Sequence, residues 1–260
     1  MNLAQIYLVG VSPQPCDFTL GRLALTCDIS GALYAPAERT LLVADLHLEK
    51  GASRAARGFM LPPYDTRETL SRLARVIAHY DPRRVIALGD SFHDAAGPAR
   101  LASLEIERAM LADLMRGRDW LWLTGNHDPA LPESLGGEVA AHAELAGVRL
   151  VHEPSCEAGH EIAGHLHPVA TLTGRAGRLR ARCFARNEAR CIMPAFGAFT
   201  GIYGRNEPHA RRLTLQVRGG GLMLLVMLLA ALTARVDALA GLSAAGTTWV
   251  LVVATTVIAW

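Results

Sequence analysis

Short apolar runs alternate with amphipathic helical patterns over most of the chain. Four of these runs predict strands that are buried on both faces of a sheet, and they lie at 41–44, 85–88, 120–124 and 148–151. Helical spacing of apolar residues predicts a helix that begins with a capping box of Asp65 and Glu68 and ends at Asp81. A second amphipathic helix is predicted over 98–115, with Leu104 on its apolar stripe. This alternation of strands and helices indicates a layered α/β fold.

Shorter strands broken by turns are predicted on both sides of this region. Those before it lie at 6–11, 20–27 and 32–34, and those after it lie at 169–172, 179–185 and 190–193. The segment 49–57 is predicted to be a loop after the first buried strand. Its cations Lys50, Arg54 and Arg57 either face solvent or contact substrate phosphates.

A polar cluster follows each of the buried strands. Asp45 and His47 follow the first, and on an extended backbone their side chains would point the same way. The later clusters contribute six further candidates, which are Asp90, Asn126, His127, His152, His165 and His167. Because such strand ends lie along one edge of an α/β sheet, the clusters predict a single site. His93 and Asp94 either orient the site from behind or are ordinary loop residues.

Carboxylate, amide and imidazole ligands in this combination suit divalent transition metals. The candidates are numerous enough to complete two adjacent metal spheres, provided that one carboxylate bridges them. In a two-metal site the ions lie ~3.5–4 Å apart and clamp the attacking and leaving oxygens of an in-line displacement. A metal-bridging hydroxide would be the nucleophile, and one group that binds no metal should protonate the leaving oxygen.

Composition is compatible with these predictions and argues against some other classes of protein. The chain has 260 residues, enough for one large α/β domain with an appendage, and its net charge of +2 does not by itself indicate a nucleic-acid partner. Five cysteines without a Cys-x-x-Cys pair argue against a disulfide framework and against a zinc ribbon. Residues 1–20 lack a basic region followed by an apolar core, so no signal peptide is expected and the body of the chain should be cytoplasmic.

The order of the clusters closely resembles the motifs of the calcineurin-like metallophosphoesterase superfamily. Those five motifs stand here as Asp45-Leu46-His47, Gly89-Asp90, Gly125-Asn126-His127-Asp128, His152 and Gly164-His165-Leu166-His167. The resemblance implies a four-layered metallophosphatase fold, in which a two-sheet β-sandwich is flanked by helices. It implies one metal held by Asp45, His47, Asp90 and His167, and a second held by Asp90, Asn126, His152 and His165, with Asp90 as the bridge. His127 would lie beside the leaving group as acid or transition-state stabiliser.

Within that superfamily the chain resembles the bacterial ligase-associated DNA damage response endonuclease family (PdeM). The similar stretches lie at 42–51, 57–66, 88–94 and 193–201. This resemblance implies a DNA-repair endonuclease, with a DNA ligase and a helicase of the same repair system as partners. For the two divalent ions we take Mn as the first choice, with Fe, Zn and Ni as alternatives that the ligand set also tolerates.

Two rival functions stay open at this point. One is a membrane-associated phosphoesterase that acts on a small or lipid-linked phosphodiester. The other is a non-catalytic, metal-stabilised subunit of a repair complex. A complete ligand set that includes His127 argues against the second, because a scaffold has no need of the acid.

The composition changes sharply near the end of the chain. We therefore predict a metallophosphoesterase domain over 1–218 and an apolar, helical tail over 219–260 with only two charged residues. The stretch 238–260 is long enough to span a bilayer, and the arginines upstream would then keep the domain cytoplasmic at the inner membrane. An altered reading frame near Gly201 and a helix packed on the domain are the competing interpretations.

Overall fold

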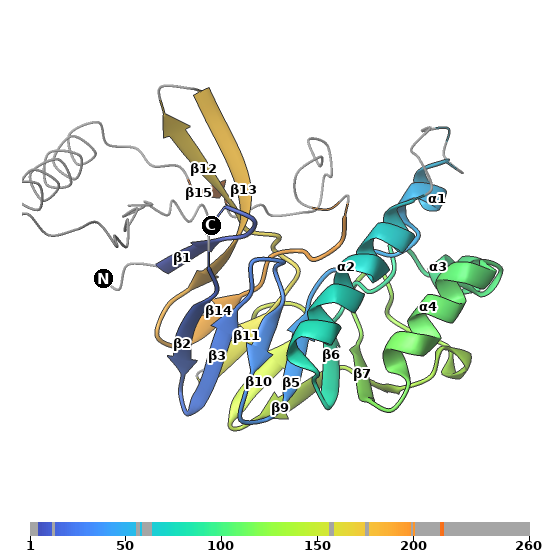
Figure 1. Ribbon diagram of the computed structural model, residues 1–260, viewed down its shortest axis with the longest axis horizontal. Helices are drawn as coiled ribbons and strands as arrows, with labels where there is room; N and C mark the ends of the chain where they lie inside the picture. Colours follow the sequence, from blue (N-terminus) through green and yellow to red (C-terminus); the bar gives the residue numbers. More distant parts are fainter. Residues whose placement is uncertain are drawn as a thin grey trace, which may run out of the picture.

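The computed structural model describes residues 5–11, 14–55, 58, 64–155, 159–174, 177–198, 200 and 214–215, and in them two β-sheets pack face to face (Figure 1). The first sheet has seven strands in the order β2-β3-β4-β5-β6-β7-β8. They are β2 (Cys16–Leu20), β3 (Leu23–Cys27), β4 (Leu33–Ala35), β5 (Thr40–Val43), β6 (Arg84–Leu88), β7 (Asp119–Leu123) and β8 (Glu138–Ala140).

The second sheet has eight strands in the order β15-β12-β13-β14-β11-β10-β9, and β1 pairs with β13 beside this path. Its strands are β1 (Gln5–Leu8), β9 (His142–Leu145), β10 (Val148–Val151), β11 (His160–Ala163), β12 (Val169–Gly174), β13 (Gly177–Arg186), β14 (Arg190–Ile192) and β15 (Thr214–Leu215). The mixed α/β class that the sequence predicts is therefore present in this structure.

Parallel strands at the middle of each sheet bring their carboxyl ends together. In the first sheet β5, β6 and β7 are parallel, with Val43 beside Ala87 and Leu88 beside Leu123. In the second sheet β10 and β11 are parallel as well. These strands are the continuous apolar runs of the sequence, and they lack polar alternation because both faces of the first sheet are covered.

The main core fills the space between the sheets. Leu42, Ile86 and Leu123 of the first sheet share one cluster with Leu150 and Ile162 of the second, and all five side chains are 0% exposed. Burial of each such side chain contributes roughly 1.5–3 kcal/mol relative to leaving it in water. This core fixes how the two sets of strand ends face each other.

Helices cover the outer face of the first sheet (Figure 1). They are α1 (Lys50–Ala55), α2 (Asp65–Tyr80), α3 (Gly97–Ala102), α4 (Glu105–Met115) and the short 3-10 helix η1 (Glu133–Leu135). On α2, Leu70, Leu73 and Ile77 share a buried cluster with Leu41 and Val43 of β5. The described residues thus form three layers, and the helical fourth layer that the resemblance implies is not among them.

The helix predicted over 98–115 is two helices, which is a correction. The chain leaves helical geometry at Leu104, where ψ is 96°, and the Ser103 hydroxyl donates to the Arg100 carbonyl at 2.6 Å just before this point. Leu104 is 36% exposed, so it does not belong to the apolar stripe. A serine that bonds back to the preceding turn competes with helix continuation, which accounts for the break.

Three smaller predictions are also corrected. Asp65 lies inside α2 instead of capping it, because its Oδ2 accepts the Gly51 N–H at 2.9 Å and so ties α1 to α2. The strand predicted over 20–27 is a hairpin of β2 and β3, turned at Gly21 with φ +59°. Part of the predicted loop 49–57 is helix α1, and Lys50 is buried there.

The C-terminal predictions fall outside the described part of the chain. The tail over 219–260, the stretch 238–260 and the boundary at 218 all lie there, so they stay predictions. Where the structure is described, it contains no helix with the length and apolarity that a membrane crossing needs.

Candidate metal centre

Polar side chains converge where the carboxyl ends of the two sets of parallel strands meet. The His47 N–H donates to the Asp90 carbonyl at 2.9 Å, which joins the segments that follow β5 and β6. From the second sheet, His152 Nδ1 donates to the Leu88 carbonyl of β6 at 2.9 Å. All eight candidates from the sequence lie in this region, which we call the metal centre: Asp45, His47, Asp90, Asn126, His127, His152, His165 and His167.

The backbone at the metal centre is left-handed. Asp45, His47, Asp90, His165 and His167 have φ angles of 52°, 44°, 48°, 65° and 45°. The prediction of an extended backbone at Asp45 and His47 is therefore wrong, although both side chains do reach the same site. A left-handed non-glycine residue costs about 1–2 kcal/mol, so the surrounding bonds must hold these residues in place.

Two glycines are needed because the ligands pack against their backbone. A Cβ at Gly125 would overlap Asp90 Oδ1 and the Asp90 backbone nitrogen. A Cβ at Gly89, where φ is +76°, would overlap the ring of His152. The glycines before these clusters therefore allow close approach as well as a turn.

A first group of possible ligands is formed by Asp45, His47 and His167, whose ligand atoms all lie within 4.8 Å of one another. His167 Nε2 is 3.2 Å from Asp45 Oδ1 and 3.4 Å from His47 Nε2. Asp90 joins this group from one side, with its Oδ2 at 3.8 Å from His47 Nε2. Burial and the neighbouring His167 lower the pKa of His47, which keeps the ring neutral and able to donate a lone pair.

A second group is formed by Asp90, His152 and His165, with the Asn126 amide beside them. His152 Nε2 lies 3.3 Å from Asp90 Oδ1, 3.0 Å from Asn126 Oδ1 and 3.2 Å from His165 Nδ1. The two carboxylate oxygens of Asp90 therefore face different groups. Burial alone would raise the pKa of Asp90, but His152 in its protonated form donates a hydrogen bond and carries a charge that lower this pKa overall.

The hydrogen bonding of His152 shows that the second group fits a cation. A carbonyl only accepts, so His152 Nδ1 carries the hydrogen towards Leu88, and Nε2 of the neutral ring is an acceptor. That atom faces the Asp90 and Asn126 oxygens at 3.3 and 3.0 Å, and acceptors at these distances repel one another unless a proton or a metal ion lies between them. Burial would lower the pKa of His152, yet Asp90 and Asp45 raise it to about 9. A site that attracts a proton this strongly suits a divalent cation.

His127 lies at the open side of the metal centre. Its Nδ1 donates to the His93 carbonyl at 2.8 Å, and its backbone N–H donates to Asp90 Oδ1 at 2.9 Å. Its Nε2 is 3.9 Å from Asp90 Oδ2, and its side chain is 35% exposed. The ring is thus held through Nδ1 while Nε2 is turned towards the groups that would surround a substrate.

His93 is part of the metal centre, which the sequence left open. Its ring is buried and stacks on His127 with centroids 5.3 Å apart, and it forms a third group of possible ligands with His47 and His127. A histidine three positions after Asp90, in a turn where ligands cluster, was the signal for it.

Asp128 also has a clear position that sequence reasoning did not assign. Its Oδ1 accepts the backbone N–H groups of Asp90 and Gly125 at 3.1 and 3.0 Å, and its Oδ2 accepts that of Phe92 at 3.0 Å. Burial raises the pKa of Asp128 to about 6, although these bonds oppose the rise. Asp128 therefore orders the turn that presents Asp90.

Comparison with known proteins gives a match among the solved structures. No family model and no curated protein matches the chain. Among solved structures, the crystal structure of the Pseudomonas putida nuclease MPE matches with a TM-score of 0.60 and 34% sequence identity. The match covers 76% of this chain and 94% of the Pseudomonas putida chain. The chain therefore belongs to the same family as the Pseudomonas putida nuclease MPE.

Proposed function

We propose that the chain is a metal-dependent nuclease that hydrolyses phosphodiester bonds with two divalent ions. The position of Asp90 carries this proposal, because its Oδ1 is 3.3 Å from His152 Nε2 and its Oδ2 is 3.8 Å from His47 Nε2. A single carboxylate between two ligand groups is what a bridged pair of ions requires. Membership of the same family as the Pseudomonas putida nuclease MPE supports phosphodiester hydrolysis as the reaction.

The ligand roles follow the two groups of the metal centre. Asp45, His47, Asp90 and His167 would hold one ion, and Asp90, Asn126, His152 and His165 would hold the other. When bound, two divalent ions, Mn first among Mn, Fe, Zn and Ni, supply Lewis acidity that activates water and neutralises charge on the phosphate. The strand ends position these ligands.

His127 would act on the leaving group as a proton donor or as a stabiliser of its charge. Because its Nδ1 hydrogen is committed to the His93 carbonyl, only Nε2 can exchange a proton with a substrate. We propose that Nε2 donates that proton to the departing oxygen, or stabilises the charge that builds on it. Its partial exposure leaves room for a strand of nucleic acid at this side.

DNA is the substrate we propose, in a cytoplasmic repair system. A DNA ligase and a helicase as partners rest on the resemblance at 42–51, 57–66, 88–94 and 193–201 alone. The membrane-associated phosphoesterase and the non-catalytic repair subunit remain as distinct outcomes of the experiment below.

The experiment measures Mn-dependent hydrolysis by the full chain. Substrates are single-stranded, duplex and nicked DNA and an aryl phosphodiester, and the variants are Asp90→Ala and Asp119→Ala. Asp119 is a matched control because its carboxylate lies at the amino end of β7, is 68% exposed and pairs with Arg83 at 3.8 Å.

Three results are distinguishable. DNA cleavage that disappears in Asp90→Ala and persists in Asp119→Ala supports the nuclease. Cleavage of the aryl diester alone supports the two-metal chemistry, overturns the DNA substrate and favours the membrane-associated phosphoesterase of a small or lipid-linked phosphodiester. A folded, metal-loaded protein that cleaves neither DNA nor the aryl diester would overturn the enzymatic function and favour the non-catalytic subunit.

A further inference from the structure

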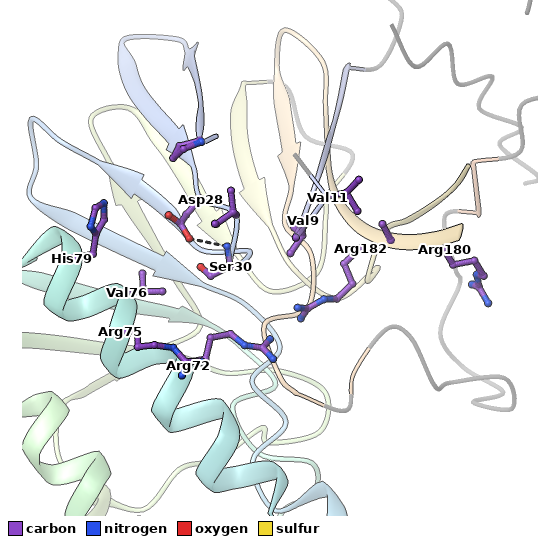
Figure 2. Close-up of a pocket in the computed structure, with 14 residues that line it drawn as sticks. Val9, Val11, Asp28, Ser30, Arg72, Arg75, Val76, His79, Arg180 and Arg182 are labelled. Carbon is purple, nitrogen blue, oxygen red and sulfur yellow. Dashed lines mark hydrogen bonds between the residues drawn. The ribbon is translucent and has the colours of Figure 1, made fainter. Parts of the chain in front are cut away.

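A cavity of about 720 Å³ opens outside the metal centre, and none of the eight candidate ligands lines it (Figure 2). Two arginines on α2, Arg72 and Arg75, line one side, and two on β13, Arg180 and Arg182, line the other. Apolar groups such as Val9 complete the wall. We call this the arginine cavity, and its size is that of a small-ligand site.

The loop after β14 separates the arginine cavity from the metal centre. On the side of the metal centre, the Phe196 N–H donates to the Ala44 carbonyl at 2.8 Å. On the side of the cavity, the Phe196 carbonyl accepts Arg72 Nη1 at 2.9 Å and Arg182 Nη1 at 3.2 Å. Arg182 Nη1 also donates to the Ala195 carbonyl at 2.6 Å. The backbone of one loop therefore bonds both to two arginines of the cavity and to the residue before Asp45.

The guanidinium groups of Arg72 and Arg182 approach each other without a counter-ion. Figure 2 shows the two side chains reaching towards each other from α2 and β13. Beyond the Nη1 bonds to backbone carbonyls, their N–H groups donate to no described residue, and no described carboxylate pairs with either. Burial and the nearby Arg72 lower the pKa of Arg182 to about 10. Two half-buried cations with unused donors are a place where an anion gains charge-assisted bonds.

The acidic residues near the arginine cavity already have hydrogen-bond or ion-pair partners. Asp28 is the one acid among the described residues that line the arginine cavity, and its carboxylate accepts from the Tyr80 hydroxyl at 2.8 Å and the Ser30 N–H at 2.7 Å. Glu68 lies 3.7 Å from Arg75 and neutralises that charge in part. The cavity therefore keeps an excess of positive charge.

We propose that the arginine cavity binds a phosphate group of a nucleic-acid strand, away from the phosphodiester that is cut. Guanidinium groups offer paired donors that match phosphate oxygens, and the apolar wall suits a sugar or a base. The strand as the source of the phosphate rests on the proposed function. The link between the two sites is Phe196, whose N–H donates to the carbonyl of Ala44, the residue before Asp45, and whose carbonyl accepts from Arg72.

The test is binding of a fluorescein-labelled single-stranded oligonucleotide to the full chain in EDTA, where no cleavage occurs. Arg72→Gln removes the charge but keeps an amide that can donate to the Phe196 carbonyl. Arg180→Gln changes an exposed side chain that pairs with no described carboxylate, so folding is not at risk. Arg22→Gln is the matched control, since Arg22 is exposed in the turn between β2 and β3 and does not line the cavity.

Both cavity variants should raise the dissociation constant, by about tenfold for Arg72→Gln and severalfold for Arg180→Gln. Each should reduce the slope of log K against log salt by roughly 0.7–1, the value for one lost phosphate contact. Arg22→Gln should stay within twofold of the wild-type chain. Titration with inorganic phosphate separates the two sources, because free phosphate should bind only weakly and should compete for the same arginines.

Binding by both cavity variants that equals that of Arg22→Gln would overturn the proposal. The proposed function is judged separately, by metal-dependent DNA cleavage in the wild-type chain. DNA cleavage by the wild-type chain, together with unchanged oligonucleotide binding in Arg72→Gln and Arg180→Gln, would overturn the cavity proposal and leave the nuclease proposal standing. Weakened binding of oligonucleotide and phosphate without any cleavage keeps the cavity as a phosphate site and overturns the nuclease.

Discussion

The metal centre and the arginine cavity lie on opposite sides of one loop and are built from opposite chemistry. The metal centre gathers acceptor atoms, namely carboxylate oxygens, an amide oxygen and imidazole nitrogens, at distances of 3.0–3.4 Å from one another. The arginine cavity gathers donors that are fixed by backbone carbonyls. In each case groups of like character lie close together, so a ligand of opposite charge would bind favourably there.

The two regions also differ in how they are held in place. Five residues of the metal centre adopt left-handed backbone, and Asp128 ties its turns by accepting three backbone N–H groups. The arginines lie on the regular elements α2 and β13, where no strain is needed. Changes at the metal centre should therefore affect the reaction, while changes at the cavity should affect strand binding.

The largest effect should come from removing a ligand. His152→Asn should lower Mn-dependent cleavage by at least about a thousandfold, the scale for losing one member of a catalytic unit. Oligonucleotide binding in EDTA should not change, because the arginine cavity is intact. His142→Asn is the control, since His142 is exposed on β9. A parallel loss of strand binding in His152→Asn would break the distinction between the two regions.

Removing the proposed acid should have the next largest effect. His127→Asn should lower kcat by about 10²–10⁴-fold, the usual range for a lost general acid. Metal content and KM should stay close to those of the wild-type chain, because Nε2 of His127 is 3.9 Å from Asp90 Oδ2 and His127 belongs to neither of the two groups that we assign to the ions. A loss of bound metal measured by atomic absorption would instead assign His127 to the ligands.

A methyl group placed against Asp90 should weaken metal binding. Gly125→Ala should lower metal affinity by about 10–100-fold, as changes to groups that orient ligands do. Gly147→Ala offers a contrast: its φ is +80° but nothing lies within 4 Å, so it should lose only about 1 kcal/mol of stability. Metal titrations and thermal unfolding of both variants check this, and equal metal affinity in the two would refute the packing argument.

The smallest effect concerns His93. His93→Ala should reduce kcat by about tenfold at unchanged metal content, because the ring stacks on His127 and orients it. If His93→Ala instead lost an ion, the group of His47, His93 and His127 would be a ligand set in its own right. Metal analysis beside steady-state kinetics separates these results.

The sequence predicts that the eight candidates lie together because each of them is close to a strand end. Each candidate, from Asp45 to His167, stands next to an apolar run, and parallel strands bring their carboxyl ends together. The left-handed backbone escaped prediction, since tertiary bonds impose it on residues that disfavour it. The break at Leu104 escaped prediction for a different reason, because helical spacing of apolar residues continues across it.

The arginine cavity has no signature in the sequence. Arg72 and Arg182 are far apart in the chain, one on a helix and one on a strand, and neither belongs to a motif. Phe196 illustrates the same limit, since only the structure shows that its ring is fully buried and that its backbone contacts both regions. Contacts of this kind depend on how β13 and α2 meet, which residue patterns do not encode.

The most direct test of the central claim is electron paramagnetic resonance of the Mn-loaded full chain. Two ions that share the Asp90 carboxylate should give a spin-coupled dimanganese signal at two ions per chain. Asp90→Asn should convert this signal into that of isolated Mn. A fully loaded wild-type chain that shows only isolated Mn, or binds one ion, would contradict the bridged pair on which the proposed reaction depends.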